Sequence, residues 1–263
     1  MNILDKIIET KRQEVEQLRK VTPEPVLQEG KYFHRKGLSL KNRLLESRLP
    51  GIIAEFKQKS PSKGEINYAV KVDTVTRGYT EAGAAGLSVL TDFEYFGGTM
   101  TNLIRAREAN PDTPILRKDF MIDPYQLTEA KAMGADVILL IAACLSAGEI
   151  HSMAEQAKAL GMEVLLEIHG AEELDKISPA VDMVGVNNRN LKTFEVSVET
   201  SRALAARIPD QFVKISESGL SSADTIQNLF KEGYKGFLIG ETFMKTTDPA
   251  AACRELINRL KNG

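Results

Sequence analysis

The sequence predicts an α/β protein built as a closed (β/α)₈ TIM barrel with an N-terminal helical extension. Eight short apolar segments alternate with amphipathic helical segments, which is typical of a parallel sheet with helices packed outside it. Glycine repeatedly stands between a helical segment and the next apolar one, at Gly83, Gly134, Gly161 and Gly233, where a helix ends. The length of 263 residues is close to the ~250 residues of one such barrel, so we expect a single domain over 1–263.

Residues 1–50 precede the first predicted strand and form the extension. Apolar residues recur there with helical spacing among charged residues, at Ile3, Leu4, Ile7, Ile8, Val15 and Leu18. Pro23 and Pro25 end this helix, and a second helical segment covers 38–49. The barrel then occupies 51–263.

The eight predicted strands are the apolar segments of the barrel region. They cover 51–57, 85–91, 114–120, 136–143, 163–169, 183–188, 212–218 and 236–240. Helical patterns between and after them include 101–109, 124–133, 147–160, 198–207, 223–231 and 249–260. An open doubly wound sheet is the alternative, but it would favour a glycine-rich turn after the first strand, and 58–64 contains no GxGxxG.

Composition excludes several functional classes. The formal net charge of −2 gives no basic surplus for nucleic acid, although local lysines can still bind small anions. Cys144 and Cys253 are far apart and outside any CxxC, so we expect two reduced thiols and no zinc site. No segment reaches 18 apolar residues and the start is charged, so we expect no membrane span and a cytoplasmic location.

Charged side chains stand at the C-terminal ends of the predicted strands, where barrel enzymes carry their active sites. Burying such groups costs several kcal/mol unless they pair, so we expect the carboxylates to face the cations. The carboxylates are Glu55, Glu167 and Glu217, and the cations are Lys57, Lys118 and Arg189. His169, two residues after Glu167, is expected on the opposite side of its strand, in a structural role.

Two glycine-containing loops follow the last two predicted strands and predict a phosphate site. Ser218-Gly219 and Gly240-Glu241 stand where many barrels bind phosphate through backbone N–H groups. The Glu241 carboxylate must then point away, so that only its N–H binds. Lys59 and Ser60, after the first strand, complete the site because the first strand neighbours the eighth in a closed barrel.

The motifs closely resemble those of the indole-3-glycerol-phosphate synthase family, in the same order and over almost the whole chain. The resemblance rests on IAEFKQKSPS (53–62), LSVLTD (87–92), LRKDF (116–120), LEIH (166–169), GVNNRNL (185–191), SESG (216–219), LIGE (238–241) and the amphipathic start ILDKI (3–7).

This resemblance implies closure of the pyrrole ring of 1-(2-carboxyphenylamino)-1-deoxyribulose 5-phosphate with loss of CO₂ and water, a step of tryptophan biosynthesis that needs no metal or organic cofactor. It implies three catalytic residues: Lys118 is the general acid, Glu167 accepts a proton in the dehydration, and Lys57 binds the substrate carboxylate and assists proton transfer. The resemblance also implies that the substrate and the lysines are oriented by Glu55, Asn187, Arg189 and Glu217. The aromatic ring of the substrate packs against Phe120 and Leu191. The phosphate is held by Lys59, Ser60, Ser218, Gly219, Gly240 and Glu241.

Other functions remain open from the residues alone. A Schiff-base aldolase using Lys57 or Lys118, a sugar-phosphate isomerase and a non-catalytic anion-binding barrel would each use a similar mouth. For the synthase we expect a small phosphorylated substrate as the partner, and no nucleic acid, membrane or obligate protein partner.

Overall fold

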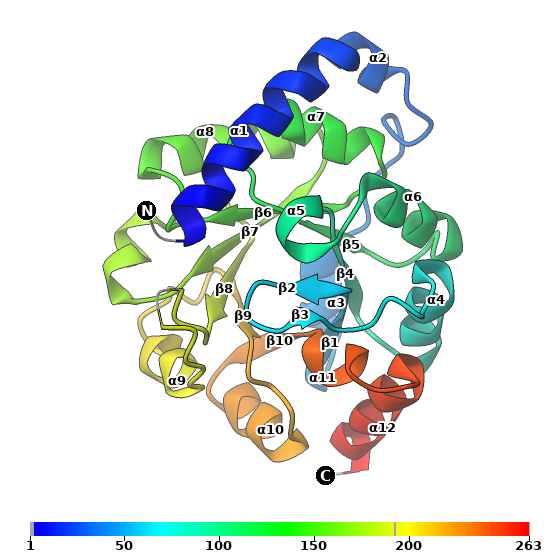
Figure 1. Ribbon diagram of the computed structural model, residues 1–263. Helices are drawn as coiled ribbons and strands as arrows, with labels where there is room; N and C mark the ends of the chain where they lie inside the picture. Colours follow the sequence, from blue (N-terminus) through cyan, green and yellow to red (C-terminus); the bar gives the residue numbers. More distant parts are fainter. Residues whose placement is uncertain (1–2, 192, 263) are drawn as a thin grey trace.

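Eight parallel strands close into a barrel in the computed structural model, which describes residues 3–191 and 193–262 (Figure 1). Each strand pairs with the next along the chain, and the last pairs with the first. The barrel strands are β1 (Gly51–Phe56), β4 (Gly86–Leu90), β5 (Ile115–Lys118), β6 (Val137–Ile141), β7 (Glu163–Ile168), β8 (Met183–Asn187), β9 (Val213–Glu217) and β10 (Tyr234–Ile239). The predicted (β/α)₈ fold class is therefore confirmed.

Helices surround the barrel because the strands bury apolar side chains on both faces (Figure 1). The surrounding helices are α4 (Val72–Ala82), α6 (Met100–Ala109), α7 (Tyr125–Ala132), α8 (Ala147–Ala159), η1 (Ala171–Lys176), α9 (Glu199–Ala205), α10 (Ala223–Lys231) and α12 (Pro249–Asn262). Gly83 ends α4 with a φ of 98°, a left-handed conformation that glycine adopts without a steric penalty.

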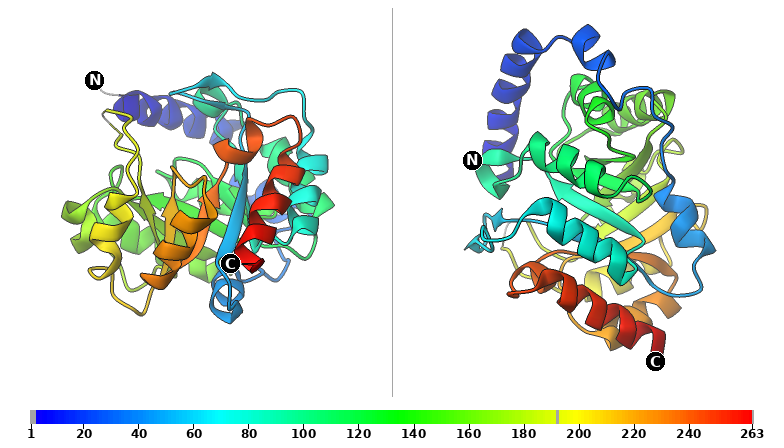
Figure 2. Two further views of the ribbon diagram at one scale, coloured as in Figure 1. Left: turned by 90° about the horizontal axis from the view of Figure 1, so that it is seen from below. Right: turned by 90° about the vertical axis from the view of Figure 1, so that its right-hand side faces the viewer.

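The N-terminal extension covers both ends of the barrel. It contains α1 (Ile3–Val21), α2 (Glu24–Gln28) and α3 (Leu40–Glu46). Helix α1 lies across the end where the strands finish, and α3 lies at the opposite end (Figure 2, left). Leu40 and Leu44 of α3 pack closely against glycines: a Cβ on Gly51 would stand 2.3 Å from Leu44 Cδ2, so α3 closes the barrel only because those positions lack side chains.

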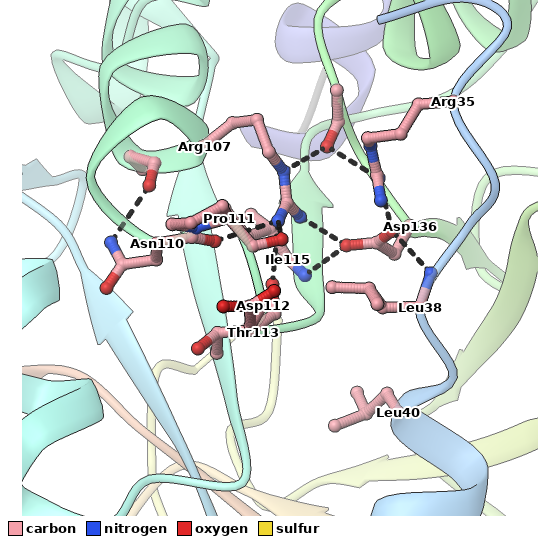
Figure 3. Close-up of polar contacts among 12 residues, drawn as sticks. Arg35, Leu38, Leu40, Arg107, Asn110, Pro111, Asp112, Thr113, Ile115 and Asp136 are labelled. Carbon is pink, nitrogen blue, oxygen red and sulfur yellow. Dashed lines mark hydrogen bonds and ion pairs between the residues drawn. The ribbon is translucent and has the colours of Figure 1, made fainter.

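A buried ion-pair cluster fastens the extension near α3 (Figure 3). The Asp136 carboxylate binds the guanidinium groups of Arg35 and Arg107. It also accepts hydrogen bonds from the backbone N–H groups of Leu38 at 2.8 Å and Ile115 at 2.9 Å. One carboxylate therefore joins the extension, α6 and the start of β5.

The predicted strands all overlap observed ones, because apolar runs and flanking glycines determine them locally. The sequence did not predict several short elements, which form where loops contact one another and leave no periodic pattern. They are α2, the hairpin β2 (Lys59–Ser60) and β3 (Gly64–Glu65), α5 (Phe93–Phe96), η1 and α11 (Glu241–Met244). Among the residues described, no helix combines the length and apolarity needed to cross a membrane.

Candidate active site

A cavity opens at the C-terminal end of the barrel, beneath α1. It brings together residues from β1, β5, β7, β8, β9 and β10 and the loops that follow them. Fourteen of the fifteen site residues expected from the sequence line it, namely Glu55, Lys57, Ser60, Lys118, Phe120, Glu167, Asn187, Arg189, Leu191, Glu217, Ser218, Gly219, Gly240 and Glu241.

Lys118 lies between two carboxylates at the centre of this cavity. Its Nζ is 2.6 Å from Glu167 Oε2 and 3.2 Å from Glu217 Oε2. Burial disfavours the charged amine, but the nearby Glu167, Glu217 and Glu55 outweigh it and raise the pKa of Lys118 above its ordinary value. Lys118 is therefore a cation in the free protein, as a proton donor must be.

The two carboxylates that hold Lys118 differ in their protonation. Burial opposes ionisation of Glu167, but Lys118 and His169 outweigh it and lower its pKa well below the usual range. Burial also dominates at Glu217; Lys118 opposes it, the Glu167 and Glu55 charges add to it, and the pKa of Glu217 rises to about 8. The cluster therefore favours the ionised form of Glu167 and the protonated form of Glu217.

Glycines make room for these carboxylates, a signal that the sequence analysis missed at Gly185. A Cβ on Gly185 would stand 2.3 Å from Glu217 Oε1, and one on Gly240 would stand 2.6 Å from Glu55 Oε1. Such separations are too short for real atoms, so alanine at either position would displace the neighbouring carboxylate.

Lys57 forms a second ion pair at the mouth. Its Nζ is 2.9 Å from Glu55 Oε1, and Ser88 donates a hydrogen bond of 3.0 Å to Glu55 Oε2. Glu55 is 3% exposed, whereas 18% of the Lys57 side chain is exposed. The ammonium of Lys57 is thus held at the cavity wall and can meet an entering anion.

Two expectations from the sequence are wrong. Arg189 does not face Glu55, Glu167 or Glu217; its Nη2 lies 3.7 Å from Glu241 Oε2, because Arg189 stands beyond the end of β8. His169 was expected on the other side of its strand, but its Nε2 lies 3.1 Å from Glu167 Oε1. Residues two apart on a strand share a face, which explains the second error.

The loop after β9 has the shape of an anion site. Ser218 and Gly219 have successive positive φ values of 68° and 72°. Backbone N–H groups in consecutive turn conformations form concave anion-binding sites, and a positive φ at a serine is a strained conformation. Ser60 also lines the cavity, and its buried Oγ has no hydrogen-bond partner in the structure.

Lys59 and Glu241 occupy the margin of this loop cluster. Lys59 is outside the cavity lining, and its Nζ donates a hydrogen bond of 2.9 Å to the carbonyl oxygen of Glu94. The carboxylate of Glu241 lies 3.9 Å from Lys63 Nζ, in addition to its contact with Arg189. Both contacts connect loops around the anion site.

Helix α1 supplies a wall of the cavity that the sequence analysis did not assign to the site. Ile3, Leu4 and Ile7 line it. Lys11 Nζ lies 3.0 Å from Asp92 Oδ2 and 3.1 Å from Asp119 Oδ1, both buried. Lys11 itself is 3% exposed. Lys11 stands on the apolar face of α1, four residues from both Ile7 and Val15, and this spacing was a signal for a buried lysine but not for the position of α1.

The arrangement brings two lysine ammonium groups, the carboxyl groups of Glu55, Glu167 and Glu217 and the loop after β9 together in one cavity. Within the described part of the chain, no three His, Cys, Asp or Glu side chains are grouped so as to hold a metal ion.

Comparisons with known proteins identify the family of this chain. The family model for indole-3-glycerol phosphate synthase matches residues 4–256. An indole-3-glycerol phosphate synthase of Bacteroides thetaiotaomicron is 46% identical over 260 residues, which are 99% of both chains. One of Salinibacter ruber is 42% identical over 258 residues, 97% of this chain and 95% of the relative.

Similar solved structures show the fold alone, because their identity is low. A 3-hexulose-6-phosphate synthase from Salmonella typhimurium superposes with a TM-score of 0.64 at 14% identity, over 81% of this chain and 99% of its own. The tryptophan synthase alpha subunit of Legionella pneumophila gives a TM-score of 0.62 at 13% identity, over 85% and 95%. With the full-length matches above, the sequence and the barrel show that this chain belongs to the indole-3-glycerol phosphate synthase family.

Proposed function

We propose that the protein converts 1-(2-carboxyphenylamino)-1-deoxyribulose 5-phosphate to indole-3-glycerol phosphate, CO₂ and water, through the side chains that converge in this cavity. The observation that carries the assignment of roles is the position of Lys118, an ammonium held between Glu167 and Glu217 at the centre of the cavity. Family membership gives the reaction, and this geometry supports the residues that perform it.

Two cationic or N–H-rich regions match the two anionic ends of the substrate. The phosphate binds to the backbone N–H groups of Ser218-Gly219 and Gly240-Glu241 and to the free Ser60 hydroxyl, with Lys59 at the margin. The carboxylate on the aromatic ring binds Lys57. Bound at both ends, the flexible substrate is held in the conformation that closes the ring, which is a large part of the acceleration in intramolecular reactions.

The aromatic ring between these ends packs against Phe120 and Leu191, which line the cavity. Asn187 and Arg189, from the end of β8, and Glu55 and Glu217 orient the substrate and the two lysines. Helix α1 adds apolar contact through Ile3, Leu4 and Ile7.

Ring closure begins when the aryl carbon that bears the carboxylate attacks the ketone carbon. Lys118 donates a proton to the ketone oxygen, which becomes a hydroxyl group. The C–CO₂⁻ bond then breaks, CO₂ leaves, and its electron pair restores the aromatic ring. A positioned acid of this kind typically contributes ~10²–10⁴-fold to the rate.

Dehydration completes the indole. The hydroxyl group leaves as water with a proton from the Lys57 ammonium, which the departure of CO₂ has freed, and the ring nitrogen assists by donating its electron pair. Glu167 accepts the proton lost from the neighbouring carbon. Glu167 suits this role because it is ionised and lies 2.6 Å from Lys118, so acid and base are adjacent.

The direct test is an assay of the purified protein with the carboxyphenylamino substrate, followed by indole fluorescence and by released CO₂. We expect one CO₂ for each indole formed. A Schiff-base aldolase would instead form a covalent adduct that borohydride traps on lysine, and an isomerase would change the sugar without releasing CO₂. A folded protein that produces no indole would contradict the proposal.

A cytoplasmic location, and activity without nucleic acid or an obligate protein partner, stay predictions from the sequence.

A further inference from the structure

His169 lies directly behind Glu167 and has no part in the chemistry described above. It follows the last residue of β7 and is not among the residues that line the cavity. Its Nε2 lies 3.1 Å from Glu167 Oε1, and 11% of its side chain is exposed. An imidazole in this position can act on the substrate only through Glu167.

Glu173, from η1, holds the other side of the imidazole. Its Oε2 lies 3.5 Å from His169 Nδ1 and accepts a hydrogen bond of 2.6 Å from the His169 backbone N–H. Neither ring nitrogen has hydrogen-bond geometry, and the two side-chain contacts are ion pairs when the imidazole is protonated. The imidazole is thus placed between two carboxylates, and the backbone bond fixes one of them.

Cys144 and Lys176 also lie near Glu167 and Glu173, but the charge of His169 depends on the two carboxylates. Cys144, beside β6, stays a neutral thiol because burial, with Glu167 and Glu173, raises its pKa to about 12. The Lys176 ammonium is turned to the carbonyl oxygens of Ala142 and Leu145. Burial favours the neutral imidazole, but Glu167 and Glu173 outweigh it and raise the pKa of His169 to about 9.

The two oxygens of Glu167 have different partners. Oε2 binds Lys118 at 2.6 Å, whereas Oε1 accepts a hydrogen bond of 3.2 Å from Asn187 Nδ2 and faces His169. The neighbouring carboxyl group of Glu217 contacts Lys118 Nζ at 3.2 Å. When Lys118 gives its proton to the substrate, Oε2 loses its cation while Oε1 keeps His169.

Building on the proposed function, we propose that His169, held by Glu173, is a positioning residue that keeps Glu167 ionised and fixes it through Oε1 while Lys118 serves the substrate. The oxygen left free by Lys118, Oε2, then accepts the proton in the dehydration. A buried carboxylate without this second cation would take up a proton at the stage where it must act as a base.

The first test is the pH dependence of kcat and of the single-turnover rate in His169→Asn, which removes the charge and retains polar atoms. Loss of a neighbouring cation raises the pKa of Glu167, so the acid limb of both profiles should move upward by about one pH unit. KM should stay within about twofold, because His169 does not line the cavity. His151→Asn is the matched control, since His151 contacts Ser178 and lies outside the site.

The second test is independent of activity and of the stability of that variant. In the wild-type protein, the NMR titration of the His169 ring should show a cation throughout the neutral range. Glu173→Gln retains the acceptor for the backbone N–H and removes one negative charge, so it should lower the pKa of His169 by about one unit or more.

The outcomes separate this proposal from the one on which it rests. A neutral His169 at pH 7 in the wild-type protein, or pH profiles unchanged in His169→Asn, would overturn the positioning role while leaving the synthase activity intact. A wild-type protein without indole formation would overturn the proposed function, and the titration of His169 would still decide its charge.

Discussion

Glu217 is a site residue whose burial lowers the stability of the folded protein when its carboxyl group ionises. It is buried between Lys118 and the floor formed by Gly185, and its Oε1 has no hydrogen-bond partner. Its pKa of about 8 means that the folded protein holds a proton there that the unfolded chain releases at a much lower pH. Lys118 contacts both Glu167 and Glu217, but its shorter contact, of 2.6 Å, is with Glu167. One ammonium therefore stabilises the ionised form of Glu167 more than that of Glu217.

Replacing this carboxyl group should change how stability depends on pH. Between the ordinary glutamate pKa and about 8, the folded state binds one proton more than the unfolded state, so the free energy of unfolding falls as pH rises through this window. Glu217→Gln removes this dependence. The Tm of Glu217→Gln minus that of the wild-type protein should therefore increase from pH 5 to pH 9.

Calorimetry at a series of pH values would measure that difference. Glu255→Gln, on an exposed ion pair of α12, provides the control and should follow wild type at every pH. A Tm difference for Glu217→Gln that is constant, or that declines with rising pH, would show that Glu217 is ionised in the folded protein at neutral pH.

At the scale of elements, α1 is both a wall of the cavity and a separate helix that must be held there. Lys11 supplies the attachment: it binds Asp92, which begins α5, and Asp119, which stands between Lys118 and Phe120. Burial opposes its charge, but these carboxylates outweigh it and raise the pKa of Lys11. The position of α1 and the end of β5 are therefore coupled through one ammonium.

Lys11→Met should destabilise the protein by about 3–5 kcal/mol, because it leaves the buried Asp92 without its cation and leaves the buried Asp119 with Arg117 alone. It should also raise KM, since Ile3, Leu4 and Ile7 line the cavity. Chemical denaturation and steady-state kinetics measure the two effects. Lys20→Met, which removes an exposed ion pair with Glu16, should change stability little and leave KM unaltered. Equal effects of the two changes would refute the attachment role.

The loop after β9 gives a second element-scale prediction. At Gly219, with a φ of 72°, an added Cβ would stand 2.5 Å from Val196 Cγ1. Gly219→Ala should therefore distort the N–H groups that bind phosphate. We expect KM to rise by about tenfold or more, which corresponds to the loss of one charge-assisted hydrogen bond. Gly83→Ala has similar backbone strain at the end of α4, away from the cavity, and should reduce stability alone. An unchanged KM in Gly219→Ala would place the phosphate elsewhere.

The sequence predicts the barrel and most of its mouth because both follow local patterns. Apolar runs ending in Glu55, Lys118, Glu167 and Glu217 identify the strands and the active end together. The partner of Arg189 could not be predicted in this way, because it lies beyond a strand end, where loop contacts decide orientation. The placement of α1 is also a tertiary property, since an amphipathic period shows that a face is buried but not against what.

Over the whole molecule, the two ends of the barrel have different tasks. The C-terminal end holds charged groups that face a cavity, some in unfavourable states, whereas the opposite end holds the buried ion pairs of Asp136. Asp136 is the clearest example, with two guanidinium groups and two backbone N–H donors (Figure 3). This division is general in barrel enzymes, where the lower end stabilises and the upper end reacts.

Asp136→Asn should therefore lower stability and leave catalysis intact. It leaves Arg107, which is 2% exposed, without its carboxylate, at a cost of about 3–5 kcal/mol. Urea denaturation should show this loss while kcat and KM stay at wild-type values at a temperature where the variant is folded. A large fall in kcat in the folded variant would mean that the two ends are coupled.

The central claim is that Lys118 is the acid of a cavity in which ionisable side chains converge, and turnover by Lys118→Ala tests it most directly. Indole fluorescence, measured alongside circular dichroism, should show a loss of at least ~10²-fold with the fold retained. Lys214→Ala is the matched control: Lys214 is a buried lysine of β9 that binds the Ala205 carbonyl oxygen outside the cavity, so its loss should spare turnover. Near-normal turnover by a folded Lys118→Ala protein would contradict the claim.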